Sequence, residues 1–537
     1  MIVGVDAGGT NVDAVGLDPD EGVVTTSKTS LDPSNPSKSV RDSVSGLEVD
    51  GNDVERVVVA TTLVLNSALQ DRLPDVTNVV VPGPGLSPRL AFHGDENIVA
   101  RGAVDHRGRL TEDARLGESP SNSVVAVTSK FSPRNPEVEE TIADGIDADF
   151  IALGNESGGK LGFPERAATT VFNAKSKTVF ERFEYDIGEA LADVGVDAPV
   201  YYLKGDGAML SEDAALSNPS HTVRSGSAAS ALGLGSLSGR RDAICVDIGG
   251  TTTDITVLDD GFPITEEGYT VNGLSTYYDG VDSVNLPLGG DTAVDDDGLT
   301  EHRRGSAAAF GGSTPTPTDA LHVTREMAQG DVTSAETAFD SVSVSADEVI
   351  DEAVSRIADE VGSLARDYAK DTVVAGGVLA PYLAPRIGEA VDPEVEVVVP
   401  DNAEVSGAAG CAAARVSVKT DVHIDTVQNV TTVTALGSTK RETSYDDLGD
   451  DHLRRIACDE ALRAAEDAGA RRSYDYGNGV DDTDTDHAEV EVLNARIFNV
   501  VENSRVAGQI ADATAQVVPD LSYRHGSDNE NRDRDEA

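Results

Sequence analysis

The feature that most constrains this chain is a short motif that occurs twice, once at the N-terminus and once near the middle. Both copies read as an apolar strand, an aspartate, any residue, Gly-Gly-Thr, two further residues and a second aspartate. The first copy turns after Asp6 and the second after Asp247. A repeat at so long a separation indicates duplicated domains rather than a solenoid of short units.

Each copy contains the residues that a phosphate-binding turn needs. Two glycines let the backbone turn tightly and present its N–H groups to an oxyanion, and the threonine hydroxyl adds a donor. One copy alone is equally compatible with an ordinary hairpin turn, but two copies at equivalent strand ends favour phosphate binding. The expected phosphate-binding residues are Gly8, Gly9, Thr10, Asn11, Gly249, Gly250, Thr251 and Thr252.

The aspartates that precede the turns are the expected catalytic residues. A carboxylate repels a bare phosphate, so Asp6 and Asp247 are useful there only if Mg²⁺ or a nucleophilic water lies between them and the phosphates. We expect one to hold Mg²⁺ through water and the other to position or deprotonate the attacking group, and the sequence leaves open which does which. Asp254 is a third candidate for the Mg²⁺ site, although Asp13 and Asp254 also suit hydrogen bonds to turn backbone.

Three further segments are similar to parts of the actin-like ATPases. Residues 371–382 read as a strand, Gly376-Gly377 and a helix, which resembles the adenosine-binding segment of that superfamily. Residues 224–234 and 401–413 resemble its two connecting helices, rich in small residues, which cross at the hinge, and we expect Gly407 at this crossing. The implied fold is α/β: two duplicated ribonuclease-H-like domains, as in actin, hexokinase and heat-shock-type chaperones, with a cleft that binds ATP and Mg²⁺.

Changes in composition predict the domain boundaries. We expect a first actin-like lobe at 1–224, a second at 225–418, a small C-terminal α/β domain at 419–525 and a disordered acidic tail at 526–537. Within the second lobe, residues 281–318 are rich in Gly, Asp, Thr and Pro and predict a loop region.

A series of longer segments resembles the hydantoinase A / oxoprolinase (N-methylhydantoinase A-like) family, in the family's order over about residues 1–415. Besides the two repeated turns, the segments are ATTLVLNSAL at 60–69, DHRGRL at 105–110, FSPRNPEVEE at 131–140, ERAATTVFNA at 165–174, RSGSAAS at 224–230 and PTPTDAL at 315–321. The resemblance implies an ATP-dependent amidohydrolase that phosphorylates and opens a cyclic amide (a lactam, hydantoin or imide). It also implies that Thr61, Thr62 and Asn66 lie near the substrate, whereas N-capping of a helix is the alternative for the threonines.

The chain departs from the family pattern at three places. Family members usually have His-Gly where this chain has Val59-Ala60, their Gly-rich stretch is reduced here to residues 288–292, and their C-terminal part is longer. The particular cyclic amide, the oligomeric state and the need for a partner subunit similar to hydantoinase B are therefore open. A small-molecule kinase and a non-catalytic ATPase switch acting on a protein partner are the alternative functions on this fold.

The charge of the chain restricts its partners and surroundings. It has 95 acidic and 42 basic residues, a net charge of −53 and a pI near 4.3, which indicates a halophilic, haloarchaeal-type protein of a salt-rich cytoplasm, with K⁺ as a further expected ligand. Nucleic acids and anionic membranes are poor partners for such a surface. Cys245, Cys411 and Cys458 form no C-x-x-C pair, so neither a disulfide nor a zinc site is expected, and His106 is expected in an exposed turn.

Overall fold

A computed structural model of the protein describes residues 1–32, 35–157, 159–445, 448–470, 489–502 and 504–518. The tail expected at 526–537 lies outside these residues. No helix in these ranges is long and apolar enough to cross a membrane.

The first of two similar sheets contains the N-terminal turn. It has six strands in the spatial order β12-β11-β4-β1-β2-β3, in which β1, β2 and β3 are antiparallel and β4 and β11 run parallel to β1. The strands are β1 (Ile2–Ala7), β2 (Asn11–Asp18), β3 (Gly22–Ser30), β4 (Arg56–Thr61), β11 (Val200–Leu203) and β12 (Met209–Ser211). Because β1 and β4 are central, they are almost entirely apolar and buried.

The second sheet repeats this plan around the second turn. Its strands β13 and β14 form the antiparallel hairpin, and β23 and β24 run parallel to β13. The strands are β13 (Ala243–Ile248), β14 (Thr253–Asp259), β15 (Phe262–Pro263), β20 (Ser283–Leu286), β23 (Thr372–Gly376) and β24 (Glu396–Val398). The expectation of a loop at 281–318 was partly wrong, because β20 pairs with β14, and β21 (Thr292–Asp295) forms a hairpin with β22 (Gly298–Arg303).

Helices pack on the faces of both sheets. The longest are α5 (Phe163–Asp193) on the first lobe and α10 (Ala346–Tyr368) on the second. A reciprocal capping box between Ser345 and Glu348 starts α10, and Val349, Ile350 and Ile357 are among its residues in the second-lobe core. The other helices of the two lobes are α1 (Pro36–Ser45), α2 (Leu63–Leu69), α6 (Glu212–Ser217), α8 (Pro317–Val323), α9 (Val332–Phe339) and α11 (Ala380–Ala390).

Two helices made of small residues connect the lobes. Helix α7 (Ser225–Ser238) lies on the second sheet, and α12 (Ser406–Ala413) lies on the first. They touch backbone to backbone, since a β-carbon on Gly233 would lie 1.8 Å from the Ser406 carbonyl oxygen and one on Gly410 would lie 1.8 Å from the Ala229 carbonyl oxygen. Gly407, which the sequence analysis placed at this crossing, faces Asp6 instead.

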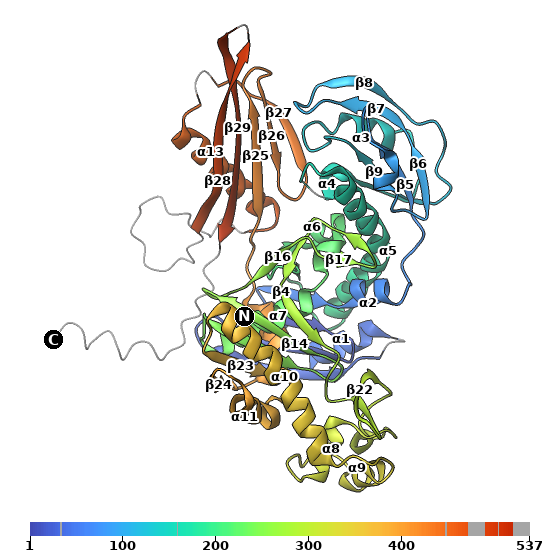
Figure 1. The fold of residues 1–537 in the computed structure, drawn as a ribbon, viewed down its shortest axis with the longest axis vertical. Helices are drawn as coiled ribbons and strands as arrows, with labels where there is room; N and C mark the ends of the chain where they lie inside the picture. The colour runs from blue at the N-terminus through green and yellow to red at the C-terminus, as the bar shows by residue number, and fades with distance from the viewer. Residues whose placement is uncertain (33–34, 158, 446–447, 471–488, 503, 519–537) are drawn as a thin grey trace, which may run out of the picture.

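Two further sheets lie side by side above the lobes (Figure 1). One is a parallel sheet within the first-lobe sequence, ordered β10-β9-β5-β6 and covered by α3 (Glu137–Ala143), and the other is an antiparallel C-terminal sheet, ordered β27-β26-β25-β29-β28 and covered by α13 (Asp450–Asp467). Their strands are β5 (Thr77–Val81), β6 (Glu96–Val99), β9 (Val124–Ser129), β10 (Phe150–Leu153), β25 (Lys419–Asp425), β26 (Val430–Thr434), β27 (Ser438–Glu442), β28 (Glu489–Glu502) and β29 (Arg505–Val518).

One part of the second-lobe sequence packs on the first lobe. Four short strands, β16 to β19, lie within residues 265–281. Within this segment, Tyr269, Val271 and Tyr278 belong to the same hydrophobic core cluster as residues of β1 and β4. The sequence boundary at 224 therefore does not follow the packing, because apolar residues after β15 are buried against the opposite lobe.

Candidate active site

The two repeated turns have the same local geometry. Each is a tight hairpin turn closed by a backbone hydrogen bond, from Gly8 N to Asn11 O at 3.1 Å and from Gly249 N to Thr252 O at 3.0 Å. In the first hairpin Asp6 is directly opposite Asp13, and in the second Asp247 is opposite Asp254. All four carboxylates therefore lie at the ends of the paired strands, beside the turns.

The structure brings these four aspartates together from both lobes. Burial, together with the negative charges of Asp13, Asp247 and Asp254, raises the pKa of Asp6 to about 7. Burial likewise raises the pKa of Asp254 to about 6, with a contribution from Asp247. Because the pKa of Asp6 responds to the charges of Asp247 and Asp254 on the second sheet, the two hairpins place their carboxylates near one another.

The helix α7 holds the second pair of aspartates. Ser230 Oγ donates a hydrogen bond to Asp247, and Ser227 Oγ donates one to Asp254 at 2.9 Å. Asn285 of β20 donates to the other oxygen of Asp254. The sequence analysis assigned this helix a hinge role only, although the hydroxyls repeated among its alanines and glycines were a readable signal.

Lys28 of β3 is a site residue that the sequence analysis missed. It is the cross-strand partner of Asp13, and its Nζ lies 2.6 Å from Asp13 Oδ2 and 3.1 Å from the Glu404 carbonyl oxygen. The positive charge of Lys28 lowers the pKa of Asp6, Asp13 and Asp247 and so opposes the effect of burial. Asp13 thus forms an ion pair rather than the turn cap that was one of its expected roles.

The two phosphate-binding candidates differ in what lies beside them. In the first turn, a β-carbon on Gly9 would lie 3.6 Å from Asn66 Nδ2. The reduced Gly-rich stretch is hydrogen-bonded to the second turn, because Asp291 N donates to the Gly250 carbonyl oxygen at 2.6 Å and Gly290 N donates to Gly249 O at 2.9 Å. The two turns are therefore alike in backbone and differ in their neighbours, while the second glycine of each, Gly9 and Gly250, is exposed.

Thr61, Thr62 and Asn66 lie at the first turn. Thr61 Oγ1 accepts a hydrogen bond from Leu63 N at 3.1 Å at the start of α2, and Asn66 Nδ2 donates to Thr62 Oγ1 at 3.0 Å. Ser225 at the start of α7 donates to the Thr61 carbonyl oxygen at 3.0 Å. The N-cap of α2 is Thr62, which makes no side-chain capping hydrogen bond, so the contact at Thr61 is not the cap that the alternative predicted, and Asn66 lies beside Gly9.

The expected adenosine segment lies next to the second turn. Gly376 is the register partner of Asp247 on the parallel strand β23. Gly377 has a φ of 86°, and a β-carbon there would lie 2.3 Å from the Ile248 carbonyl oxygen, so only glycine is accommodated. Its N–H donates to Ala403 O at 2.9 Å, just before α12.

The donor set is compatible with Mg²⁺ held partly by a nucleotide. Among the described residues, no group of three or more His, Cys, Asp or Glu side chains is arranged to hold a metal by itself. Asp6 Oδ1 and Asp13 Oδ1 are buried without a hydrogen-bond partner, which leaves acceptor oxygens for a hydrated cation. Mg²⁺ usually keeps several waters and binds one or two carboxylates together with phosphates, in agreement with this arrangement.

One histidine and two cysteines singled out in the sequence lie outside the set of expected catalytic residues. His106 is exposed in the turn between β7 (Arg101–Val104) and β8 (Leu110–Arg115). Cys245 and Cys411 are free and buried. Burial raises the pKa of both thiols, and the nearby charges of Asp247 at Cys245 and of Asp6 at Cys411 raise it too, so the two cysteines are buried beside the aspartate cluster while His106 is exposed.

Sequence comparison identifies the family. A model of the hydantoinase/oxoprolinase N-terminal region matches residues 2–99, and one of hydantoinase/oxoprolinase matches residues 166–420. The chain belongs to the hydantoinase/oxoprolinase family. A comparison with curated protein sequences gives no match. The second family match spans α7, the second turn and α12, so the elements around Asp247 are those of a hydantoinase/oxoprolinase.

Two solved structures have a similar fold. A nucleotide-free acetone carboxylase structure shares 15% identity with a TM-score of 0.69, and an ATP-dependent caprolactamase from Pseudomonas jessenii shares 16% with a TM-score of 0.66. Each alignment covers 98% of this chain and 88% of the other. This hydantoinase/oxoprolinase therefore has the expected α/β fold with duplicated ribonuclease-H-like domains.

Proposed function

We propose that the protein is an ATP-dependent amidohydrolase that phosphorylates the carbonyl oxygen of a cyclic amide and opens the ring with water. Membership of the hydantoinase/oxoprolinase family supports the reaction class. The observation that carries the proposal is the convergence of Asp6 and Asp247 from two duplicated hairpins, each beside a glycine turn. The fold shared with an ATP-dependent caprolactamase agrees with a lactam as one form of substrate.

The proposed ligands divide between the two lobes. ATP supplies the phosphoryl group and Mg²⁺ neutralises its charge. The turns 8–11 and 249–252 bind the phosphates through backbone N–H groups, and Gly376-Gly377 leave room for the adenosine beside the second turn. Asp247 and Asp254 are fixed by serines of α7, so we assign them the water-mediated contacts to Mg²⁺, with the partnerless Asp13 Oδ1 as a further acceptor for the waters of the ion.

Asp6 is the better candidate for moving a proton. Its Oδ1 has no hydrogen-bond partner, and its pKa is raised to about 7 by burial and by the neighbouring aspartates. A carboxyl group with a pKa near neutrality can both accept and release a proton during turnover. We therefore assign Asp6 to deprotonation of the attacking water and place the substrate beside Thr62 and Asn66.

Other expectations stay proposals. A hydantoinase B-like partner subunit, a salt-rich cytoplasm and a role for K⁺ rest on the family resemblance and on the net charge of −53. In the ring-opening assay described next, replacing K⁺ by Na⁺ at equal ionic strength tests the role of K⁺. Adding a partner subunit to the same assay tests whether one is needed.

The test is an assay for ADP, phosphate and ring-opened product in molar KCl with Mg²⁺, across lactams, hydantoins and imides. We expect ADP and phosphate to form in equal amounts with ring opening. The variant Asp247→Asn should still bind ATP but lose about 10²-fold or more in turnover. The same substitution at the exposed Asp20 is the matched control.

Two outcomes of this assay contradict the proposal. Phosphate retained on a stable product indicates a small-molecule kinase. ATP turnover that needs a protein partner and no cyclic amide indicates an ATPase switch.

A further inference from the structure

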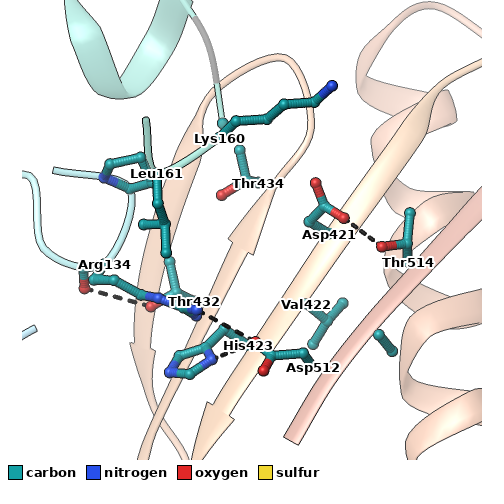
Figure 2. Close-up of a pocket in the computed structure, with 13 residues that line it drawn as sticks. Arg134, Lys160, Leu161, Asp421, Val422, His423, Thr432, Thr434, Asp512 and Thr514 are labelled. Atoms are coloured by element: carbon teal, nitrogen blue, oxygen red, sulfur yellow. Dashed lines mark hydrogen bonds and ion pairs between the residues drawn. The ribbon is translucent and has the colours of Figure 1, made fainter. Parts of the chain in front are cut away.

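A second polar site lies away from the two glycine turns. It is found where the C-terminal sheet faces the part of the first-lobe sequence that contains the parallel sheet β10-β9-β5-β6. It is a cavity of about 290 Å³ between residues 133–134 and 159–161 on one side and strands β25, β26 and β29 on the other. Figure 2 shows the side chains that line it. None of these residues belongs to the aspartate cluster around Asp6 and Asp247.

The strand pattern makes this face of the C-terminal sheet polar. On β29 the alanines Ala511, Ala513 and Ala515 are buried in the core, while Asp512 and Thr514, which alternate with them, line the cavity. The strand β25 repeats the alternation, with Asp421 and His423 at the cavity. One face of the sheet is covered by α13, and the opposite face carries these charged and hydroxyl groups.

One side of the cavity is cationic. Arg134 Nη2 lies 3.3 Å from Asp512 Oδ1, and His423 Nδ1 lies 2.7 Å from the same oxygen. Asp512 Oδ1 is therefore the shared partner of the Arg134 guanidinium and the His423 ring. Arg134 Nε is buried without a hydrogen-bond partner. The guanidinium thus has more donor capacity than Asp512 satisfies, and planar donors of this kind bind carboxylates well.

The other side carries Asp421 and also Lys160, whose charge is paired with Glu267 at 3.2 Å. Asp421 accepts a hydrogen bond from Thr514 Oγ1 at 2.5 Å and makes no ion pair with any described residue. Figure 2 shows Asp421 and Thr514 apart from the group formed by Arg134, His423 and Asp512. A compact ligand with one negative and one positive end would complement both sides, whereas a polyanion such as a nucleotide would be repelled by the two aspartates.

We propose that this cavity binds a small amino acid, with its carboxylate on the Arg134 side and its ammonium group at Asp421. Opening a lactam leaves a carboxylate and an amine on one molecule, so the ligand class is that of a ring-opened lactam. The cavity is then a product-sensing site, and this last step alone rests on the proposed function.

The test is calorimetric titration of the full chain in molar KCl without ATP. The probes are glutamate, γ-aminobutyrate and ε-aminocaproate, with glutarate lacking the amine and cadaverine lacking the carboxylate. We expect at least one amino acid to bind with a Kd of about 1 mM or tighter. The variant Asp421→Asn should weaken that binding about tenfold or more and leave glutarate unaffected, because only the partner of the ammonium group is removed.

Two control variants separate the possible failures. Glu442→Gln removes an exposed carboxylate from β27 of the same sheet and should leave binding unchanged. Asp6→Asn should bind the amino acid normally even though it is expected to lose ring opening, so failure of the proposed activity does not affect this result. The proposal is overturned if no amino acid binds, if glutarate binds as tightly as the amino acids, or if folded Asp421→Asn binds like the unsubstituted chain.

Discussion

Gly407 of α12 lies directly against the carboxylate of Asp6. A β-carbon at Gly407 would be 2.2 Å from Asp6 Oδ2 and 3.0 Å from its Cγ, distances at which one of the two groups must move. The helix that follows β24 of the second sheet therefore sets the position of an aspartate on the first sheet. Glycine is required at position 407 because a side chain would collide with Asp6. A special backbone conformation is not the reason, since Gly407 is helical and has no positive φ.

Replacing Gly407 by alanine should impair catalysis more than stability. The added methyl group displaces Asp6, and a shift of about 1 Å at a reacting group can cost about 10²-fold in turnover. Alanine also favours a helix over glycine by about 1 kcal/mol, which offsets part of the strain. The measurements are kcat and Tm, with Gly188→Ala in α5 as the control, because a β-carbon there would meet nothing within 4 Å. Wild-type turnover in Gly407→Ala contradicts the assignment of Asp6.

Gly410→Ala should instead destabilise the protein. The new β-carbon would lie 1.8 Å from the Ala229 carbonyl oxygen, and neither backbone can move without separating α7 from α12. Overpacking of this kind costs about 1–3 kcal/mol, and a helix crossing with backbone contact belongs at the upper end. Chemical unfolding of this variant beside Gly188→Ala measures the loss. An unchanged free energy of unfolding means that the two helices are free to separate.

Lys28 and Asp13 should be energetically coupled. Lys28→Met leaves the partly buried Asp13 without its cation and increases the repulsion among the aspartates. A double-mutant cycle with Asp13→Asn should give a coupling free energy between about 0.5 and 3 kcal/mol. Lys28→Arg should restore most of the stability because it keeps the charge. If the effects of Lys28→Met and Asp13→Asn simply add, the ion pair does not hold the site together.

The local parts of the site could be predicted from the sequence. The turns after Asp6 and Asp247 carry their geometry in adjacent glycines, and α10 begins at a capping box within its own sequence. Strand β29 could also have been recognised, because apolar and polar residues alternate from Ala511 to Val517. These features depend on neighbours a few residues away.

The remaining site contacts depend on register and packing. Lys28 reaches Asp13 only because β2 and β3 pair in one particular register, which shifts between Gly16 and Leu17. Ser230 reaches Asp247 only because α7 crosses the second sheet at one angle. The repeated hydroxyls of α7 mark that helix as unusual, but no local signal shows that Ser230 meets Asp247 or that Lys28 meets Asp13, so these contacts follow from the tertiary structure.

The net charge predicts a strong dependence of folding on salt. With −53 charges, repulsion between carboxylates is large when the Debye length is about 30 Å, near 0.01 M salt, and small when it is about 3 Å, near 1 M. We expect a cooperative thermal transition in molar KCl and a much lower Tm, or none, at the low concentration. Equal Tm values at the two concentrations exclude salt adaptation.

A pair of glutamates away from the active site should make stability depend on pH. Glu184 of α5 has its pKa raised from 4.5 to about 7, first through a hydrogen bond with Glu212 of α6, then through burial and the charge of Glu212. The folded protein therefore binds a proton there more tightly than the unfolded chain does. This contribution to stability is complete below pH 4.5 and is lost as the pH rises through about 7.

The variant Glu184→Gln removes this dependence while keeping a donor for Glu212. Near pH 8, where both glutamates are charged in the unsubstituted protein, Glu184→Gln should have the higher Tm, and near pH 5 the two proteins should differ little. Glu189→Gln, at an exposed position on the same helix, is the control at equal ionic strength. If the Tm difference between Glu184→Gln and the unsubstituted protein is the same at both pH values, Glu184 and Glu212 do not share a proton. Only a shared proton makes the benefit of removing one charge appear as the pH rises.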